Sequence, residues 1–268
     1  MTGDDMAARG NGKAEGSMRE QSRRTSLWTK LGRRYEARRT IHRRVPWRGF
    51  ALSALNLVAI AFFVLDTPLG QAAKNLPPPL ISFAGNVTDI GKLAYILAAM
   101  LTVMVTVFLI SRRLSGVRRR FRQAYLGQMA LYTALSVLVA SIVVHILKYA
   151  IGRSRPLLFD SDGVLSFHPF SFDFLHASFP SGHSAHIGAL FMALALLFPR
   201  VRLVFIGLGL WLGATRIIIG VHFPSDVVAG LALGAWIAFA MSILFARFGL
   251  VFTVGKNGWP VPRLGRII

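Results

Sequence analysis

Six long stretches of the sequence carry no Asp, Glu, Lys or Arg, and they constrain the fold more than any other feature. The hydrocarbon core of a bilayer requires about 20 mostly apolar residues per helix, with a range of roughly 17–25. A helix in the fourth stretch is expected to start near Ser181, and the fifth must continue past Arg216 to about Val221 to reach a spanning length. We therefore predict an all-α, polytopic membrane protein with six transmembrane helices. The six stretches comprise residues 49–65, 93–111, 123–147, 174–199, 203–215 and 227–246.

Composition supports a membrane protein and excludes several other classes. Hydrophobic residues make up 54% and charged residues 16% of the 268 residues, yet the formal net charge is +20. A soluble globular domain carries about 25% charged residues, so an ordinary soluble enzyme is disfavoured. A nucleic-acid-binding protein would explain the basic charge but not the apolar excess, so we expect no nucleic-acid partner. Because the chain has no cysteine, disulfides, zinc–thiolate sites, iron–sulfur clusters and a cysteine nucleophile are excluded.

The distribution of charge predicts how the helices are oriented. If the N-terminus is cytoplasmic, the cytoplasmic segments contain 25 of the 31 Lys and Arg residues and 5 of the 11 acidic residues. The net charge is then +20 on the cytoplasmic side and zero on the other side. Short loops rich in Lys and Arg stay in the cytoplasm. We predict cytoplasmic N- and C-termini and a multi-pass protein of a bacterial inner membrane; the sequence does not determine its oligomeric state.

The ends of the apolar stretches divide the chain into three parts. Residues 1–46 are predicted to form a basic cytoplasmic extension, 47–250 the six-helix transmembrane domain, and 251–268 a cytoplasmic C-terminal tail. The first ~20 residues are rich in Gly, Ser and charge, which is typical of disorder. Residues 27–44 place apolar side chains at helical spacing among Arg and Lys. Two interpretations fit this segment: an interfacial helix on anionic lipid, or a solvated basic tail.

Three groups of polar residues follow on the non-cytoplasmic side, and the first closes the third predicted helix. Lys148 and Arg155 are seven residues apart, so a helical stretch would present both on one face. Pro156 disfavours a helical conformation at Arg155 and turns the chain there. Two cations without a nearby acid suit an anion, and a guanidinium binds phosphate oxygens in a bidentate manner. The alternative is a pair of interfacial cations that extend toward water.

The second group, Pro180-Ser181-Gly182-His183, is typical of a helix start with Ser181 as the N-cap residue. A helix N-terminus offers unpaired N–H groups and the positive end of the helix dipole, which together bind phosphate. Gly182 allows close approach of the backbone, and His183 is placed to donate a proton. The alternative is an ordinary helix cap with an incidental histidine.

The third group joins the fifth and sixth helices and contains Arg216, His222 and Asp226. His222 and Asp226 are four residues apart across Pro224, which we predict to lie in the first turn of the sixth helix. A carboxylate there can hold the imidazole N–H and raise the nucleophilicity of the ring; alternatively, Asp226 only complements the helix dipole. Arg216 lies within an apolar stretch, and a charge inside a membrane is a functional candidate by default.

Together, the three groups resemble the three-part motif of the type-2 phosphatidic acid phosphatase superfamily, which contains membrane lipid phosphatases and soluble vanadate haloperoxidases. The six-helix layout is similar to the membrane branch over about residues 47–250, and the basic extension lies outside the resemblance. Thr215 differs from the serine that the family usually has before the arginine, but it keeps the hydroxyl. The matching pattern is Lys148-x6-Arg155-Pro156, Pro180-Ser181-Gly182-His183 and Arg216-x5-His222-x3-Asp226.

The resemblance implies a role for each of these residues. The histidine of the third motif, here His222, is the nucleophile in this family and forms a phosphohistidine intermediate. Asp226 orients it, and His183 protonates the leaving alkoxide and later activates water. Phosphoryl transfer mainly needs positioning and neutralisation of charge on oxygen, so we expect no metal in the site and no cofactor. The residues that correspond to the family's phosphoryl-binding groups are Lys148, Arg155, Arg216, Ser181 and Gly182.

These features predict an integral-membrane phosphatase that hydrolyses a phosphate monoester or diphosphate of a lipid in the outer, periplasmic leaflet. Candidate substrates are undecaprenyl diphosphate, lipid A phosphate, phosphatidylglycerophosphate and phosphatidate, which the sequence does not distinguish. One alternative is a lipid-to-lipid phosphotransferase; another is a non-catalytic lipid-phosphate binder or transporter. The presence of both His183 and His222 argues against the binder, because binding alone needs no acid and nucleophile.

Three further histidines, His168, His176 and His186, are candidates for metal binding or substrate entry. His186 follows His183 by three residues and could join His222 and Asp226 in a metal site, but the neighbouring cations would repel the ion. His168 and His176 fall in the long loop after the third helix, and we interpret them as solvated residues that can shape substrate entry.

Overall fold

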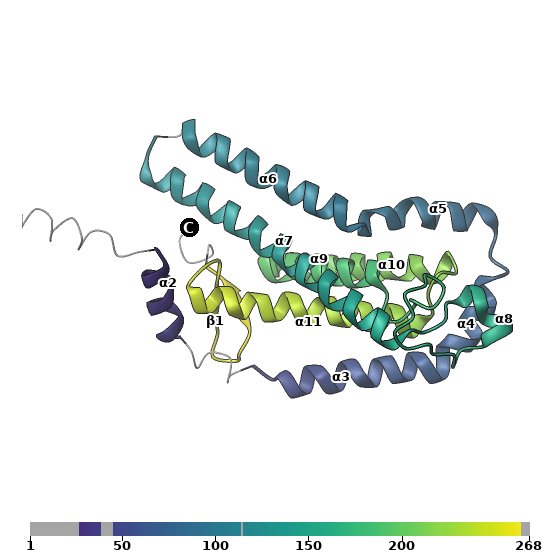
Figure 1. Cartoon of the computed structure of the whole chain (residues 1–268). Helices are drawn as coiled ribbons and strands as arrows, with labels where there is room; N and C mark the ends of the chain where they lie inside the picture. The colour runs from purple at the N-terminus through teal and green to yellow at the C-terminus, as the bar shows by residue number, and fades with distance from the viewer. Residues whose placement is uncertain (1–26, 39–44, 114, 264–268) are drawn as a thin grey trace, which may run out of the picture.

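The computed structural model describes residues 27–38, 45–113 and 115–263, and Figure 1 shows their arrangement as a bundle of long helices. The predicted disorder of the first residues lies outside these ranges. The α-helices are α2 (Leu27–Glu36), α3 (Trp47–Ile60), α4 (Asp66–Ala73), α5 (Pro78–Thr88), α6 (Leu93–Arg113), α7 (Val117–Ile151), α8 (Phe159–Asp162), α9 (Gly182–Leu197), α10 (Arg202–Ile218) and α11 (Pro224–Phe248). The remaining elements are the π-helix η2 (Ala61–Leu65), the 3-10 helices η3 (Asp89–Gly91), η4 (Pro156–Leu158) and η5 (Pro199–Val201), and the strands β1 (Phe252–Val254) and β2 (Pro260–Pro262).

Within the described residues, five helical segments are long and apolar enough to cross a membrane, and they correspond to the first, second, third, fifth and sixth predicted spans. The fourth predicted span is α9, which begins after Ser181 as expected but has only 16 residues. A 16-residue helix is about 24 Å long, which is less than the ~30 Å of a hydrocarbon core. A helical, polytopic membrane protein is thus confirmed. The five segments of spanning length are Trp47–Ala73, Leu93–Arg113, Val117–Ile151, Pro199–Ile218 and Pro224–Phe248.

The short helix α9 lies inside the bundle, where it packs against α7, α10 and α11. Its closest approach is to α11, because glycines remove the side chains that would separate the two backbones. A Cβ placed on Gly234 would meet Ala185 O, and one on Gly230 would meet Ser181 O. Around this pair, α6 packs against α7 and α3 packs against α11. The α9–α11 contact therefore positions the N-termini of these two helices relative to each other.

The first span is longer than predicted. We expected it to end before Asp66, because an acidic residue normally marks the edge of an apolar stretch. Instead, η2 and α4 continue the helix through Asp66 as far as Ala73. The carboxylate of Asp66 is fully buried and paired with Arg153 at 2.7 Å, so it faces the inside of the protein and does not interrupt the span.

The structure also differs from the prediction in the segment before α6 and in the C-terminal tail. The apolar helix α5 precedes α6 and was not predicted, because its start is rich in proline. The C-terminal tail adds an antiparallel pair of short strands, β1 and β2, to the otherwise all-α fold. The segment after Leu27 does form a helix, α2, whose Tyr35 ring contacts Phe248 of α11 at 5.3 Å. Whether α2 touches lipid stays a prediction.

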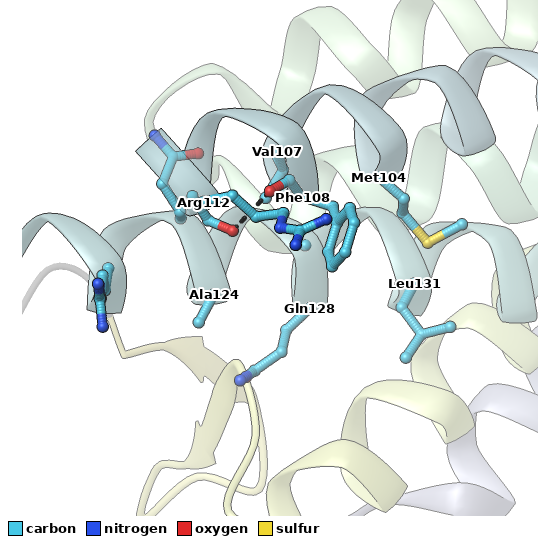
Figure 2. A pocket seen from close by; sticks show the side chains of 11 residues that line it. Met104, Val107, Phe108, Arg112, Ala124, Gln128 and Leu131 are labelled. Atoms are coloured by element: carbon cyan, nitrogen blue, oxygen red, sulfur yellow. Dashed lines mark hydrogen bonds between the residues drawn. The ribbon is translucent and has the colours of Figure 1, made fainter. Parts of the chain in front are cut away.

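A cavity of about 670 Å³ lies between α6 and α7. Figure 2 shows its lining, which includes the apolar Met104 and Phe108 together with Arg112 and Gln128. Arg112 lies at the C-terminal end of α6, whereas the first predicted motif lies at the C-terminal end of α7. Because consecutive helices run in opposite directions, this cavity is at the other end of the bundle from the motifs and is separate from them.

Candidate active site

The helix ends that carry the three predicted motifs lie together at one end of the bundle, toward the right of Figure 1. Lys148 is in the last turn of α7, Arg216 is in the last turn of α10, and Asp226 is in the first turn of α11. Ser181 caps α9, and its N–H donates to Asp226 O at 3.0 Å. The motifs therefore converge in space, as the sequence predicted.

His222 lies in the turn between α10 and α11 and faces Asp226. Its Nδ1 is 3.6 Å from Asp226 Oδ2. Ser178 Oγ lies 3.3 Å from the same nitrogen and donates to Asp226 Oδ2 at 2.6 Å. The Phe223 N–H also donates to this oxygen, at 2.9 Å, which fixes the carboxylate at the start of α11. With Nδ1 directed at Asp226 and Ser178, Nε2 is the ring nitrogen left for a substrate.

The protonation state of His222 suits a nucleophile. Burial lowers the pKa of His222 from 6.5 to about 3; Asp226 acts against this shift, and the positive charges of Arg155 and Lys148 act with it. The imidazole is consequently neutral near pH 7. A neutral imidazole has an unprotonated nitrogen that can attack phosphorus.

A buried network of ion pairs and hydrogen bonds holds Oδ1 of Asp226, the carboxylate oxygen that does not face His222. Arg153 Nη1 donates to Asp226 Oδ1 at 2.7 Å, and Arg153 Nη2 donates to Asp66 Oδ2 at 2.7 Å. Ser225 closes the network, because its hydroxyl accepts from Arg153 at 2.7 Å and its N–H donates to Asp66 Oδ1 at 2.8 Å. The three ionic side chains are fully buried. A buried charge requires such pairing, so this network holds the carboxylate that faces His222.

Arg155 is extended before Pro156, as predicted, but α7 already ends at Ile151, so Lys148 and Arg155 do not lie on one helix face. Its guanidinium donates to three backbone carbonyls: Phe174 O at 2.9 Å, Val221 O at 3.1 Å and Ala177 O at 3.3 Å. Burial lowers the pKa of Arg155 to about 10, so the group stays charged at neutral pH. Because all three acceptors are neutral carbonyls, they orient the guanidinium beside His222 but do not neutralise its positive charge.

The N-terminus of α9 adds backbone donors beside a second cation. The Ser181 hydroxyl accepts from the Ser184 N–H at 3.4 Å and from the Ser184 hydroxyl at 3.0 Å, so the helix-capping interpretation of Ser181 is correct. A Cβ on Gly182 would have Lys148 Nζ as its nearest neighbour, at 3.9 Å. The ammonium of Lys148 thus lies at the positive end of the α9 dipole, an arrangement that favours an anion.

Arg216 and His183 are the remaining predicted residues of the candidate site. Arg216 Nη1 donates to Thr88 Oγ1 at 3.3 Å, whereas its buried Nε has no hydrogen-bond partner among the described residues. A buried donor without a partner costs about 1–3 kcal/mol, and a phosphate oxygen would satisfy it. His183, in the first turn of α9, lies within electrostatic range of Arg216 and Lys148.

The charge balance of the site is unusual for a buried cluster. Within the described residues, no carboxylate forms an ion pair with Lys148, Arg155 or Arg216, although the Asp226 charge acts on the first two over a longer distance. All three are buried or half-buried. Burying a charge without a partner is costly, so three such cations around one helix N-terminus indicate a site built for an anion.

Four residues of this site were not predicted from the sequence. Arg153 lies within the first motif, Ser225 within the third and Ser178 just before the second, but the motif pattern assigns none of them a role. Asp66 lies 87 residues from Arg153, and no local pattern connects them. The only available signal was that Asp66 is an acid at the edge of an apolar stretch.

His186 is accounted for by packing, since its Nδ1 is 3.1 Å from Gly91 O in a buried position. His168 and His176 lie together in the loop after α7, with ring centroids 4.3 Å apart. They are outside the cluster described above.

Comparison with known proteins agrees with this geometry. The sequence model of the PAP2 superfamily matches residues 129–249, which include all three motifs. A lipid A 1-phosphatase of Rhizobium johnstonii is 36% identical over 89% of this chain and 97% of that protein. A lipid A 1-phosphatase of Rhizobium etli is 36% identical over 81% of this chain and 93% of that protein.

A solved structure shares the fold. The chain superposes on the crystal structure of a transmembrane PAP2-type phosphatidylglycerolphosphate phosphatase from Bacillus subtilis with a TM-score of 0.51, covering 72% of this chain and 92% of that one at 22% identity.

Proposed function

Because this chain belongs to the PAP2 superfamily and is a membrane lipid phosphatase, we propose that it removes the 1-phosphate of lipid A through a phosphohistidine intermediate. The observation that carries the proposal is the cluster of three cations without ion pairs, Lys148, Arg155 and Arg216, next to a neutral His222. Among the candidate lipid phosphates, the two lipid A 1-phosphatases that align over nearly their whole length favour lipid A.

In the proposed first step, the phosphate binds between the three cations, with the hydroxyl of Ser181 and the N–H of Gly182 completing its coordination. His222 Nε2 attacks phosphorus and forms the N–P bond while the P–O bond to the lipid breaks. His183 donates a proton to the departing lipid oxygen. Asp226 holds Nδ1–H and stabilises the positive charge that develops on the ring.

In the proposed second step, His183 takes a proton from a water molecule, and the water oxygen attacks phosphorus. The N–P bond breaks, His222 returns to its neutral form, and inorganic phosphate leaves. Positioning and charge neutralisation supply most of the rate enhancement in phosphoryl transfer, so neither step requires a metal ion.

The membrane arrangement is part of the proposal. We place the motif end of the bundle on the periplasmic side and both termini in the cytoplasm, with 47–250 as the catalytic domain and α9 as a short sixth transmembrane element. The distribution of Lys and Arg supports this orientation: the α6–α7 turn at the opposite end is flanked by Arg112, Arg113 and Arg118. The basic segment before the first span would then lie near anionic lipid.

The test is phosphate release by the purified wild type from lipid A, undecaprenyl diphosphate, phosphatidylglycerophosphate and phosphatidate. We expect lipid A to be the best substrate and His222→Ala to lower kcat by at least ~10⁴-fold, because removing a covalent nucleophile has effects of this size. His145→Gln is the matched control. Among the described residues, His145 of α7 hydrogen bonds only to Ser141 O, so this variant should keep its activity.

Several results would contradict the proposal. An active His222→Ala protein would exclude the nucleophile assignment. Preference for another lipid would exclude the lipid A specificity but not the phosphatase. Transfer of phosphate to an added lipid without release of inorganic phosphate would show a phosphotransferase, and stoichiometric binding without turnover would show a binder.

A further inference from the structure

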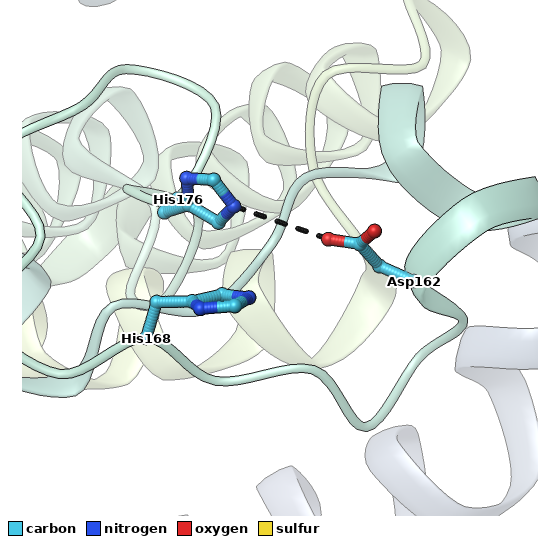
Figure 3. Close-up of side chains that lie close together, drawn as sticks. All are labelled: Asp162, His168 and His176. Carbon is cyan, nitrogen blue, oxygen red and sulfur yellow. Dashed lines mark ion pairs between the residues drawn. The ribbon is translucent and has the colours of Figure 1, made fainter.

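The loop that connects α7 to α9 contains a cluster of ligating side chains outside the proposed catalytic residues. We propose that Asp162, His168 and His176 bind a divalent transition-metal ion of the zinc type. One carboxylate oxygen and one imidazole nitrogen from each histidine all lie within 4.8 Å of one another. Figure 3 shows the three side chains converging, with Asp162 at the end of α8 and both histidines on the loop.

The chemistry of the donors selects the ion. Imidazole nitrogen suits zinc, copper, iron and nickel, whereas magnesium and calcium prefer sites made only of oxygen. Two imidazoles and one carboxylate are a donor set that proteins use for zinc with one coordination position left open. With no cysteine in the chain, no thiolate elsewhere competes for the ion.

The geometry is close to that of a coordinated site. His176 Nε2 lies 3.9 Å from Asp162 Oδ2. In a tetrahedral zinc site with bonds of 2.0–2.2 Å, ligand atoms are about 3.3–3.6 Å apart. Bringing the cluster to these distances requires the longest separation, at most 4.8 Å, to shorten by about 1.2–1.5 Å. His168 is exposed and the other two ligands are half-buried, so their side chains have room to move.

Neighbouring groups already orient the ligands. Asp173 Oδ2 is 3.1 Å from His176 Nδ1, and this contact leaves Nε2 to face Asp162. Metal-binding histidines commonly donate their second nitrogen to a carboxylate in this way. Ser166 Oγ lies 3.0 Å from His168 Nε2 and 3.5 Å from Asp162 Oδ2, which brings these two side chains together.

Asp162 is held in its ionised form. The Ser154 hydroxyl donates to Asp162 Oδ2 at 2.8 Å. This hydrogen bond is the largest cause of a pKa of Asp162 below the usual 3.8. This hydrogen bond also fixes the position of the carboxylate beside the two histidines.

The position of the cluster suggests what the ion does. Residues 174–177 hold Arg155: the Leu175 carbonyl accepts from the Arg155 N–H at 2.9 Å, and the carbonyls of Phe174 and Ala177 accept from its guanidinium. His176 belongs to this segment, so an ion shared with Asp162 would tie the segment to α8 and brace Arg155. This link to substrate binding rests on the proposed function; the metal site itself does not.

The experiment is isothermal titration of ZnCl₂, and separately of MgCl₂, into the detergent-solubilised protein, produced without a histidine tag and dialysed against EDTA. We expect one zinc ion per chain and no magnesium binding. Co²⁺ should bind at the same site and give a d–d absorption spectrum. These readouts need no lipid substrate, so they are independent of the phosphatase activity.

Variants locate the site. His168→Ala/His176→Ala should abolish zinc binding, and Asp173→Asn should weaken it by ~10–100-fold, the usual effect of removing an outer partner of a metal-binding histidine. Asp160→Asn is the control, because Asp160 belongs to α8 but lies outside the cluster and pairs with Lys74. If the double variant does not fold, the single Asp173→Asn variant still tests the site.

Absence of zinc binding by the wild type, equal binding by the double variant, or binding of magnesium alone would each overturn the metal site. Zinc binding that leaves the KM for the lipid phosphate unchanged would overturn the bracing of Arg155. We expect EDTA to raise KM severalfold and to leave kcat nearly unchanged, since the proposed chemical steps use no metal.

Discussion

The guanidinium of Arg153 is shared between two carboxylates, one from the first span and one from the last. It lies 2.7 Å from Asp66 and 2.7 Å from Asp226, and all three side chains are fully buried. Its Cζ atom lies 4.8 Å from the ring centroid of Phe62 and 4.4 Å from that of Phe223, within the range of cation–π contacts. In this position Arg153 both pairs the buried acids and orients Asp226 toward His222.

Replacing Arg153 should therefore destabilise the protein as well as inactivate it. Arg153→Met leaves two buried carboxylates without their cation, and breaking a buried ion pair in this way costs about 3–5 kcal/mol. The free energy of unfolding in mixed micelles, followed by circular dichroism against denaturant, measures the loss.

Two further variants control this experiment. Arg153→Lys keeps the charge but loses the two-pronged geometry, so it should recover only part of the stability. Arg200→Met removes an exposed arginine of η5 and should change nothing. Equal stability of Arg153→Met and the wild type would refute the importance of the network.

At this scale, the residues that the sequence predicts for the site are those whose motifs have a recognisable spacing. Lys148, His183 and His222 each lie in a motif whose local pattern carries the information. Asp66 could not be assigned, because its partner is 87 residues away and pairing across the bundle depends on how the helices pack. Its charge was instead interpreted as the end of a span.

At the scale of elements, the contact between α9 and α11 determines the relative position of two residues with proposed catalytic roles. His183 is carried by the start of α9 and Asp226 by the start of α11. Gly188, Gly230 and Gly234 let the two backbones touch, since a Cβ at any of them would meet backbone atoms of the other helix. A small displacement of α9 would move His183, the proposed acid, away from His222, the proposed nucleophile.

Gly234→Ala tests this dependence. The added methyl would lie 2.6 Å from Ala189 N and closer still to Ala185 O, so α9 must move. We expect a loss of about 1–3 kcal/mol in unfolding free energy, as for other overpacked sites. Activity should fall by up to ~10²-fold, because a displacement of about 1 Å near reacting groups has that effect. Thermal denaturation and phosphate release measure the two effects.

Gly207→Ala in α10 is the matched control, because a Cβ there meets nothing within 4 Å. Alanine replaces glycine in a helix with a gain of about 0.5–1 kcal/mol, so this variant should be at least as stable as the wild type. A Gly234→Ala protein that behaves like Gly207→Ala would contradict the close-packing argument.

Among the elements, the long apolar helices could be predicted from hydropathy alone, because an apolar stretch in a bilayer has few alternatives to a helix. The starts of α9 and α11 followed from Ser181 and Pro224, which are typical first residues of helices. The helix α5 was not predicted; it begins at three consecutive prolines, Pro77, Pro78 and Pro79, a residue type that is common in turns. The strand pair β1–β2 depends on packing against the bundle and has no strong local pattern.

At the scale of the whole molecule, the positive charge is concentrated at the end of the bundle opposite the motifs. The first four basic residues of α7, Arg118, Arg119, Arg120 and Arg122, extend the helix there. α7 has 35 residues and is about 52 Å long, so it is long enough to cross the ~30 Å hydrocarbon core and still project from one side. Such a basic end favours the cytoplasm.

The absence of cysteine makes this orientation easy to test with single cysteines. Ser161→Cys on α8 and Ser115→Cys between α6 and α7 both replace exposed residues. In spheroplasts, a membrane-impermeant maleimide should label position 161 and leave position 115 unlabelled until the cells are lysed. Labelling at position 115 alone would invert the proposed topology.

The pairing of Asp66 with Arg153 also has a consequence for biogenesis. During synthesis, the first span emerges well before Arg153, which follows Asp66 by 87 residues. Until then Asp66, which lies between the middle and the C-terminal end of the span Trp47–Ala73, is without its partner. Its cost during insertion is at most the roughly 2.5–3.5 kcal/mol of an acid at the centre of a span. In the proposed topology, this penalty is relieved only when the loop after α7 has crossed the bilayer. The first helix is therefore held firmly in the bundle only after the nascent chain has delivered Arg153 to it.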